Sequence, residues 1–446
     1  MDLTARAGLT LVSEAMLALG LDEVAKSHLA LRRRRRGFPE FDKLQAVVLV
    51  QAAGGECVED VEVLARDAGL VRLVGRPWPS ADALHAFLSG FHDEAQMANR
   101  PAEGAWIPEE NAALRGLADI NRELVHRSLA STPALRATLD LDATVIESHK
   151  REARAHYKGG RGYQPTAVLW AEQDLVVADQ YRDGNVPAGM RTPEVARRAV
   201  AALPPGVKER YFRGDSACYD EKLLKYLVQE EIAFSISADM TSELRRVCTQ
   251  PDMAWTLLEG RPEETVDFAE VEFTPGDWPK SAFPLRYVAL RISPCQISLF
   301  FTTPKYLAVV SNRWHMSAAE LVRWHWEKAG TIELTHDVTK NELAAAAPPS
   351  GKFGANAAWY RINLLTYNLL TVLRRHALPE RFRHARPKRL RYEVFTIPAQ
   401  ISSHARQLTA KLGVPSLTAE ELIVARGRLR DLQATLQAAQ TTASGA

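Results

Sequence analysis

Apolar and polar residues alternate with different rhythms in successive parts of the chain. From Leu9 to about Leu129 the apolar positions recur at intervals of three and four residues, as at Leu44 and Val48, which predicts amphipathic helices. Within this part, the section from Val58 to Phe91 is compatible with a helix-turn-helix or with a generic helical bundle. We therefore expect an N-terminal helical domain at residues 1–130.

From Leu135 the pattern changes to short apolar runs that alternate with amphipathic stretches. Strands and helices that alternate in this way indicate an α/β domain, which we place at residues 131–239. The expected strands are 137–148, 166–171, 175–181, 209–213 and 233–237, and the expected helices are 193–203 and 220–229.

The stretch at residues 240–312 has little helical period and is predicted to be a β-rich insertion. Its alternating runs are 265–273, 285–292, 297–302 and 306–310. Helical pattern returns at 317–346 and 355–376, and we assign these helices to a second part of the core at 313–378. The C-terminal region, 379–446, is basic and helical, with a last helix expected at 419–439.

Composition narrows the class of protein. Of the 446 residues, 46% are hydrophobic and 25% are charged, which is ordinary for a globular protein and excludes a fibrous or wholly disordered chain. The apolar stretch at residues 44–53 is far shorter than the roughly 20 residues that cross a bilayer. We therefore expect a cytoplasmic protein without a membrane partner. The four cysteines are scattered without a Cys-x-x-Cys pair, so neither a zinc ribbon nor a disulfide framework is indicated.

The net charge is only +2, but the positive residues are concentrated in two blocks. One block is a run of five arginines, namely Arg32, Arg33, Arg34, Arg35 and Arg36. In the other, between residues 374 and 391, eight Lys or Arg residues, including Lys388 and Arg389, accompany the single acid Glu380. Each block could be a solvated surface or a contact for DNA phosphates.

Three acids stand at positions where a catalytic site could form. Asp140 and Asp142 lie two apart in an expected strand and so share a face. That face belongs either to a site or to a solvent-exposed edge strand. Asp215 follows an apolar strand and precedes a helix, so it is either an N-cap or a ligand at the carboxyl end of the strand. Glu333 lies about two helical turns before Lys340, so both project from one face, which could also be merely solvated.

The acids make chemical sense together as a metal site. Two carboxylates about 4 Å apart repel by roughly 4 kcal/mol at an effective dielectric of about 20. A third carboxylate is therefore tolerated only if cations neutralise the cluster. Hard oxygen ligands select magnesium, with manganese as a substitute. Two such ions support in-line displacement at phosphate, which predicts phosphoryl transfer with Asp142, Asp215 and Glu333 as both the catalytic and the metal-binding residues.

Several motifs resemble the DDE transposases of bacterial insertion sequences, and in particular the insertion sequence 1380 group. They are Asp142-Ala143-Thr144, the turn Tyr157 to Pro165, Arg213-Gly214-Asp215-Ser216, and Glu333 to Lys340 followed by Pro349 to Trp359. Their order and spacing from about Thr138 to Leu370 carry the resemblance. The resemblance implies a ribonuclease-H-like core interrupted by a β-rich insertion, Asp142, Asp215 and Glu333 as the metal-binding triad, and a dimer acting on inverted-repeat ends and target DNA.

By position, Asp142 fits this family better than the alternative Asp140. The chain departs from the family where Tyr and Arg are expected before the last acid, since Trp326 and Ala329 stand there. Lys340 fits, and Lys328, one place from the missing Arg, is the candidate to replace its phosphate contact.

Glycines and aromatic residues add weaker candidates. The cluster Gly159, Gly160 and Gly162 lies between two strands, which favours a hairpin over a nucleotide-binding loop, although its Lys158 and Arg161 could contact phosphate. Gly330, in an expected helix, suggests a close approach of backbone or DNA. Trp255 and Trp278 could stack on a flipped base, but core packing is the more usual role.

These features predict a cytoplasmic, nucleoid-associated enzyme of cut-and-paste DNA transposition. Two other functions fit the same residues. A structure-specific nuclease on the same fold would cleave DNA without joining strands, and a non-enzymatic DNA-binding regulator would use the N-terminal helices and the arginine run.

Overall fold

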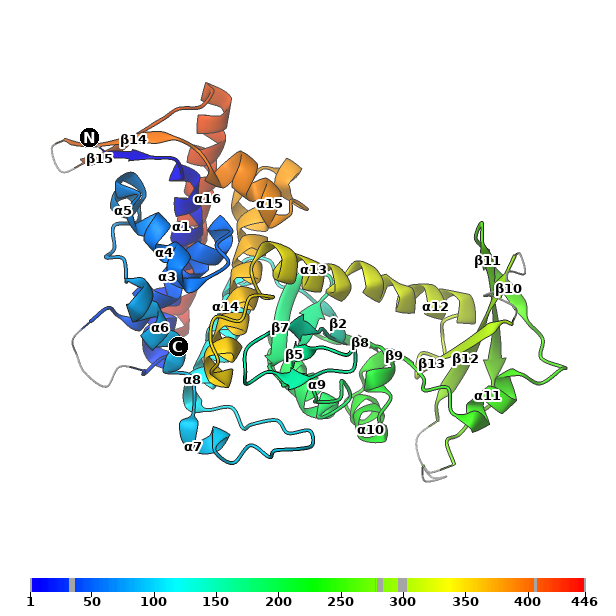
Figure 1. Ribbon diagram of the computed structural model, residues 1–446. Coiled ribbons are helices and arrows are strands. Elements are labelled where there is room, and N and C mark those ends of the chain that lie inside the picture. The colour runs from blue at the N-terminus through cyan, green and yellow to red at the C-terminus, as the bar shows by residue number, and fades with distance from the viewer. Residues whose placement is uncertain are drawn as a thin grey trace.

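The computed structural model describes residues 2–31, 37–276, 278, 284–295, 303–404 and 407–444. A mixed nine-stranded sheet runs through its middle, with the N- and C-terminal helices at one end and an antiparallel extension at the other (Figure 1). In sheet order its strands are β10 (Thr256–Gly260), β11 (Glu264–Val271), β12 (Arg286–Pro294), β13 (Lys305–Ser311), β9 (Ala233–Ser237), β8 (Glu209–Gly214), β2 (Arg136–Ala143), β6 (Thr166–Trp170) and β7 (Leu175–Gln180).

The centre of the sheet joins parallel to antiparallel pairs. Strands β2, β8 and β9 are parallel, whereas β6 pairs antiparallel with both β2 and β7. Leu139, Leu141, Phe212 and Phe234 are fully or almost fully buried, as expected for strands covered on both faces. The strands predicted at 209–213 and 233–237 are confirmed, and the helices predicted at 193–203 and 220–229 correspond to α9 (Thr192–Ala201) and α10 (Glu221–Gln229).

Residues 240–312 extend this same sheet rather than forming a separate one, because β13 pairs antiparallel with β9. Strands β11, β12 and β13 match the runs predicted at 265–273, 285–292 and 306–310, and the run at 297–302 lies outside the described residues. Strand β10 and helix α11 (Ser242–Cys248) were not predicted. Both are short, and β10 depends on a partner strand, which it meets with a register shift.

Helix α12 (Ala318–Trp326) covers the strands of the extension, where Leu258, Val288 and Leu321 belong to a second, smaller apolar cluster. The single helix expected at 317–346 is divided by the 3-10 helix η4 (Glu327–Gly330) from α13 (Ile332–Glu342). Gly330 stands at this break, and among the described residues a Cβ added there would meet nothing within 4 Å. The expected close approach of protein backbone at Gly330 is therefore wrong.

The N-terminal helices pack around α14 (Phe353–Val372), whose residues are all buried. This explains why its apolar residues are not confined to one stripe, and its polar residues, such as Asn356 and Arg361, are buried as well. The section predicted as a helix-turn-helix or bundle holds four short helical elements. The N-terminal helices are α1 (Thr10–Ala18), α2 (Leu21–His28), α3 (Glu40–Ala53), α4 (Val61–Ala65), α5 (Ala68–Val74), α6 (Ala81–Ser89), α7 (Glu94–Met97) and α8 (Ala112–Ser128), with the 3-10 helices η1 (Ala7–Leu9) and η2 (Val58–Asp60).

The two ends of the chain meet in a small sheet, in which β14 (Ala399–His404) pairs with both β1 (Asp2–Thr4) and β15 (Gln407–Leu412). The last helix, α16 (Ser416–Ser444), packs on α1 (Figure 1). Sequence patterning predicted helices alone in this region. It missed β1, whose partner strand is nearly 400 residues away, and it also missed the neighbouring pair β14 and β15. The remaining C-terminal elements are η5 (Leu373–Ala377), η6 (Glu380–Phe382), α15 (Pro387–Leu390) and η7 (Arg391–Phe395).

A second small sheet has the order β3-β5-β4, with β3 (Ile146–Glu147), β4 (Arg154–Ala155) and β5 (Arg161–Tyr163). A Cβ at Gly162 would lie 2.0 Å from the carbonyl oxygen of Ile146, so only glycine fits at this pairing. The glycine cluster thus forms the predicted hairpin between strands. No helix among the described residues has the length and apolar character needed to cross a membrane.

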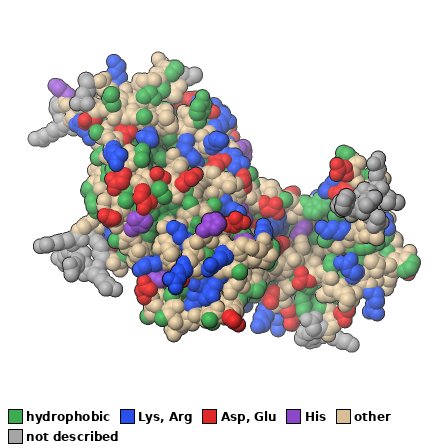
Figure 2. Space-filling model, in the orientation of Figure 1, with side chains coloured by type: hydrophobic (Ala, Val, Ile, Leu, Met, Phe, Trp, Pro, Cys, Tyr) green, Lys and Arg blue, Asp and Glu red, His purple; other side chains and the backbone are tan. Residues whose placement is uncertain are grey.

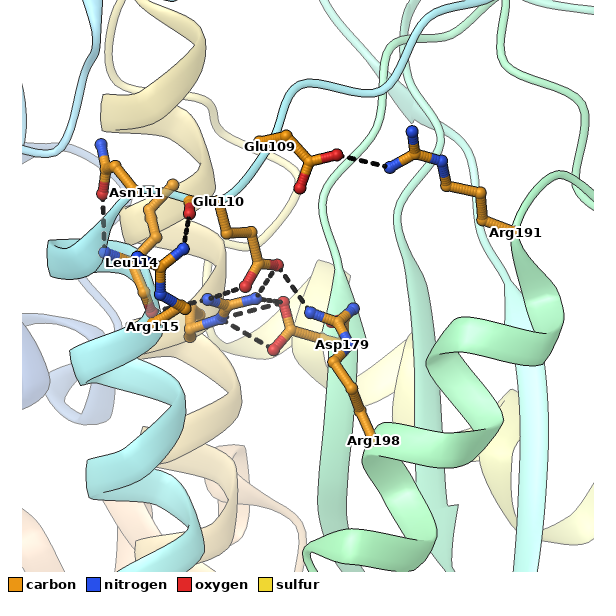
Figure 3. Close-up of polar contacts among 9 residues, drawn as sticks. Glu109, Glu110, Asn111, Leu114, Arg115, Asp179, Arg191 and Arg198 are labelled. Carbon is orange, nitrogen blue, oxygen red and sulfur yellow. Dashed lines mark hydrogen bonds and ion pairs between the residues drawn. The ribbon is translucent and has the colours of Figure 1, made fainter.

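A buried ion network joins the helices to the sheet (Figure 3). Arg361 of α14 donates from Nε to Asp179 of β7 at 2.8 Å and from Nη2 to Glu110 at 2.9 Å. Arg198 of α9 also donates to Glu110, at 2.9 Å. Burial would raise the pKa of Glu110, but the two arginines lower it to about 2. The contribution of ionised Glu110 to stability is therefore complete above about pH 4.5 and is lost as the pH falls toward 2.

We expect Arg361→Met to lower the free energy of unfolding by about 3 to 5 kcal/mol, because it leaves Asp179 and Glu110 buried without their main cation. Urea denaturation followed by circular dichroism measures this. Arg426→Met is the matched control, since Arg426 pairs with Glu14 at the surface and its loss should cost about 1 kcal/mol or less. Equal effects of the two substitutions would contradict the assignment.

Candidate active site

The carboxylates of Asp142 and Asp215 lie at the ends of two neighbouring strands. Strands β2 and β8 pair in parallel with Leu141 opposite Gly214, so the next residues, Asp142 and Asp215, come to the same edge of the sheet. Burial and the nearby Asp142 carboxylate raise the pKa of Asp215. Asp215 is also an N-cap, because its Oδ1 accepts a hydrogen bond from the backbone N–H of Ala217 at 3.1 Å. Of the two roles weighed from the sequence, the N-cap is therefore observed, and the strand-end position leaves the ligand role as a prediction.

Lys328 of η4 supplies a positive charge to this carboxylate pair. Its Nζ lies 3.1 Å from Asp142 Oδ1, and only 9% of its side chain is exposed. Burial alone would lower the pKa of Lys328, but the carboxylates of Asp142 and Asp215 outweigh this effect and raise it. The sequence suggested Lys328 as a phosphate contact, whereas the structure places its ammonium group against the carboxylates.

Asp140 has a different environment from Asp142, although the two share a face of β2. It is completely buried, and Arg213 of β8 donates hydrogen bonds to both of its carboxylate oxygens, from Nε at 2.7 Å and from Nη2 at 2.9 Å. Arg213 also donates to Glu327 at 2.9 Å and to the Trp324 carbonyl at 2.7 Å. This bridge ties β2 and β8 to the turn that carries Lys328.

Helix α13 presents one face to the end of β2. His336 Nε2 lies 3.6 Å from Asp142 Oδ2, and Lys340 Nζ donates to the Val145 carbonyl at 2.9 Å. Burial, together with nearby lysines, lowers the pKa of His336 to about 3, so its imidazole is neutral at ordinary pH. Glu333 lies one turn before His336 on the same helix and is exposed.

The structure brings together two of the three predicted acids. Across the described residues, no group of three or more His, Cys, Asp or Glu side chains is arranged to hold a metal ion, so Glu333 does not join Asp142 and Asp215 in this conformation. The donor set still suits a hard divalent cation, because such ions prefer carboxylate oxygens as ligands and two carboxylates meet here. In addition, the buried His336 Nε2 has no hydrogen-bond partner within the described part of the chain.

Basic residues lie beside this site. The segment 146–163, which forms the β3-β5-β4 sheet, carries five Lys and Arg residues and two acids. Burial and the nearby charge of Lys158 lower the pKa of Lys340, so these two predicted DNA-binding residues are neighbours. Arg161 has a structural role as well, since its guanidinium donates to the carbonyls of Ala153 and Arg151. Figure 2 shows Lys and Arg side chains gathered on the face over β5.

The other predicted DNA-binding residues lie elsewhere. Arg389 pairs with Glu393 at 2.7 Å, so part of its charge is neutralised, whereas the side chain of Lys388 is exposed. Other arginines of the same basic block also have acidic partners, namely Arg374, Arg381 and Arg386. The run from Arg32 to Arg36 lies outside the described residues.

The two tryptophans considered for base stacking are partly buried. The ring of Trp278 packs on Tyr219 with centroids 5.4 Å apart, and the guanidinium of Arg291 lies 4.7 Å from the centroid of Trp255. Each ring therefore already has a stacking partner within the protein.

Sequence reasoning missed three residues that shape the site. Arg213 and Thr331 position the strands and η4, since the Thr331 hydroxyl donates to Asp140 and to the Lys328 carbonyl at 2.9 Å. The third residue is His336, which lies beside Asp142. Its position three residues after Glu333 is the signal that places it on the same helix face.

Comparisons with known proteins place the chain in a family. No curated protein matches the chain. A solved structure of the piggyBac transposase synaptic complex with hairpin DNA is similar at 13% identity and a TM-score of 0.45, over 82% of this chain and 73% of that one. The family model described as Transposase DDE domain group 1 matches residues 1–434. The chain therefore belongs to the DDE transposases.

Proposed function

We propose that this transposase cuts DNA at terminal inverted repeats and joins the freed 3′ ends to target DNA, with Asp142, Asp215 and Glu333 as its catalytic, metal-binding carboxylates. The observation that carries the proposal is the meeting of Asp142 and Asp215 at the ends of two parallel strands. We further propose cut-and-paste transposition by a homodimer of the insertion sequence 1380 group, in a bacterial cytoplasm and bound to the nucleoid.

The strand arrangement supports a ribonuclease-H-like core. Strands β7, β6 and β2 form an antiparallel meander, and β8 and β9 follow β2 in parallel. In this arrangement, acids after β2 and β8 lie at the carboxyl ends of adjacent parallel strands, where α/β sheets bind their ligands. We assign the core to residues 131–239 and 313–378, and the insertion to 240–312. Residues 1–130 form the proposed DNA-binding domain, and residues 379–446 the basic C-terminal region.

Asp142, rather than Asp140, is the proposed first acid. Asp140 is held by a bidentate arginine and is closed to solvent, so its oxygens are already committed. Asp142 is partly exposed and faces a lysine and a neutral histidine. When bound, divalent magnesium or manganese ions would activate the attacking hydroxyl and stabilise the leaving oxygen. The protein's own part is to align the carboxylates and to hold the DNA backbone.

Glu333 would complete the triad after a movement of α13 or its side chain. It lies on the helix face that already contacts the end of β2 through His336 and Lys340. Its exposure leaves it free of buried ion pairs that would hold it elsewhere. Lys340 and Lys158 are proposed phosphate contacts beside the site, and the further candidates are Arg161, Lys328, Lys388, Arg389 and the Arg32 to Arg36 run.

We expect Asp215→Asn to reduce metal-dependent cleavage of terminal-repeat DNA by about 100-fold or more, because the substitution removes a carboxylate. DNA affinity should change by no more than about threefold, because Asn keeps the shape of the side chain. Asp220→Asn is the matched control. Both aspartates cap a helix N-terminus and Asn caps equally well, but only Asp215 neighbours Asp142. Full cleavage by Asp215→Asn would refute the assignment.

Substitution of the third acid tests whether α13 takes part. Glu333→Gln should abolish cleavage without lowering the melting temperature, since the side chain is exposed. Asp337→Asn, one turn later on the same helix, removes a surface pair with Arg386 and should leave activity within about twofold of wild type. Cleavage and differential scanning fluorimetry of both variants provide the readout. If Glu333→Gln stays active, another residue supplies the third ligand.

Joining separates a transposase cycle from plain hydrolysis. With a pre-cut repeat end that carries a 3′-hydroxyl, the protein and magnesium should form strand-transfer products with a target plasmid, resolved on a denaturing gel. The same end with a 3′-deoxy terminus is the control and should give none, because the nucleophile is missing. Cleavage without any joined product under magnesium or manganese would favour the nuclease.

A further inference from the structure

The contact between Lys328 and Asp142 differs from the surface ion pairs of this protein. Both side chains are largely shielded from solvent, with 9% and 16% exposed, and the Nζ to Oδ1 distance is 3.1 Å. By contrast, the pair of Lys352 with Glu94 leaves 45% and 74% of the side chains exposed. Water screens the second pair but not the first, so the charge of Lys328 acts strongly on Asp142 and its neighbour Asp215.

The backbone that carries Lys328 is held in place. Arg213 binds the Trp324 carbonyl and Glu327 on one side of the lysine, and the Thr331 hydroxyl donates to the Lys328 carbonyl and to Asp140 on the other. The part that can move is therefore the side chain, which is a flexible four-carbon stem with a single charged end. The neighbouring Ala329 and Gly330 are exposed, so solvent lies next to this turn.

We propose that the Lys328 ammonium is the resident counter-cation of Asp142 and Asp215, and that a divalent ion binds this carboxylate pair only by displacing it. The inference rests on the proposed function, since it takes the pair as metal ligands. The ammonium group lies within hydrogen-bond distance of one carboxylate and counters the charge of both. A divalent cation and an ammonium group at the same two carboxylates would repel each other, so occupation by one excludes the other.

This arrangement has two opposite consequences. Without metal, Lys328 stabilises the fold, because it relieves the repulsion between two partly buried carboxylates. In the presence of metal, it weakens binding, because the ion must first break the Lys328 ion pair. Metal affinity is therefore set partly by a residue that is not itself a ligand, and a released Lys328 would be free to contact a DNA phosphate.

Manganese binding to the full-length protein without DNA tests the proposal, with free Mn²⁺ measured by electron paramagnetic resonance. We expect Lys328→Met to bind Mn²⁺ about tenfold or more tightly than wild type, because the competing charge is gone. Without metal, its melting temperature should be lower than that of wild type, and Mn²⁺ should raise it by a larger increment. Lys352→Met, the matched control, should show wild-type affinity and wild-type metal-dependent stabilisation.

Two further variants distinguish an effect of the Lys328 charge from a folding defect. Lys328→Gln also removes the charge and should bind Mn²⁺ more tightly, whereas Lys328→Arg keeps the charge and should not. One outcome would overturn this inference alone. In it, Lys328→Met and Lys328→Gln bind Mn²⁺ no more tightly than wild type, while Asp215→Asn loses binding. Wild-type Mn²⁺ affinity in both Asp142→Asn and Asp215→Asn would instead overturn the metal site of the proposed function.

Discussion

The buried bridge between Arg213 and Asp140 is the interaction on which the site depends. Neither charge can be hydrated where it lies, so each requires the other, and the bidentate geometry allows little freedom. It joins two adjacent strands two residues before Asp142 and Asp215 and extends to the turn that carries Lys328. This salt bridge therefore connects the two strand ends that carry Asp142 and Asp215 with the turn that carries Lys328.

The sheet is joined to the helical part through helix α14, which is buried along its full length. Its Arg361 binds the edge strand β7 and the segment before α8, so that sheet and helices share one core. Such rigid support suits the proposed site, whose carboxylates must stay aligned while phosphodiester bonds are broken and joined. The antiparallel extension and α12 lie on the far side of the parallel strands (Figure 1).

Sequence patterning predicted most of the core, because buried parallel strands have continuous apolar runs and their lengths are set by hydrophobic burial. Strand β9 matches its prediction at both ends, and β8 differs by one residue. The pattern failed at β1, β14 and β15, which pair across the chain termini, and at the short elements β10 and α11. Strand β1 has its partner nearly 400 residues away, so no local rhythm identifies it. The other four elements are short, and short segments carry little periodicity.

The sequence alone determined which acids are available at the ends of apolar strands, since residue order decides that Asp142 and Asp215 follow β2 and β8. It also contained the motifs of a DDE transposase, and the family match bears out that resemblance. Only the tertiary structure decided that Asp140 is bound by Arg213 while Lys328 faces Asp142. These contacts join residues separated by 73 and 186 positions, and the balance between desolvation and charge pairing that selects them exists only once the chain has folded.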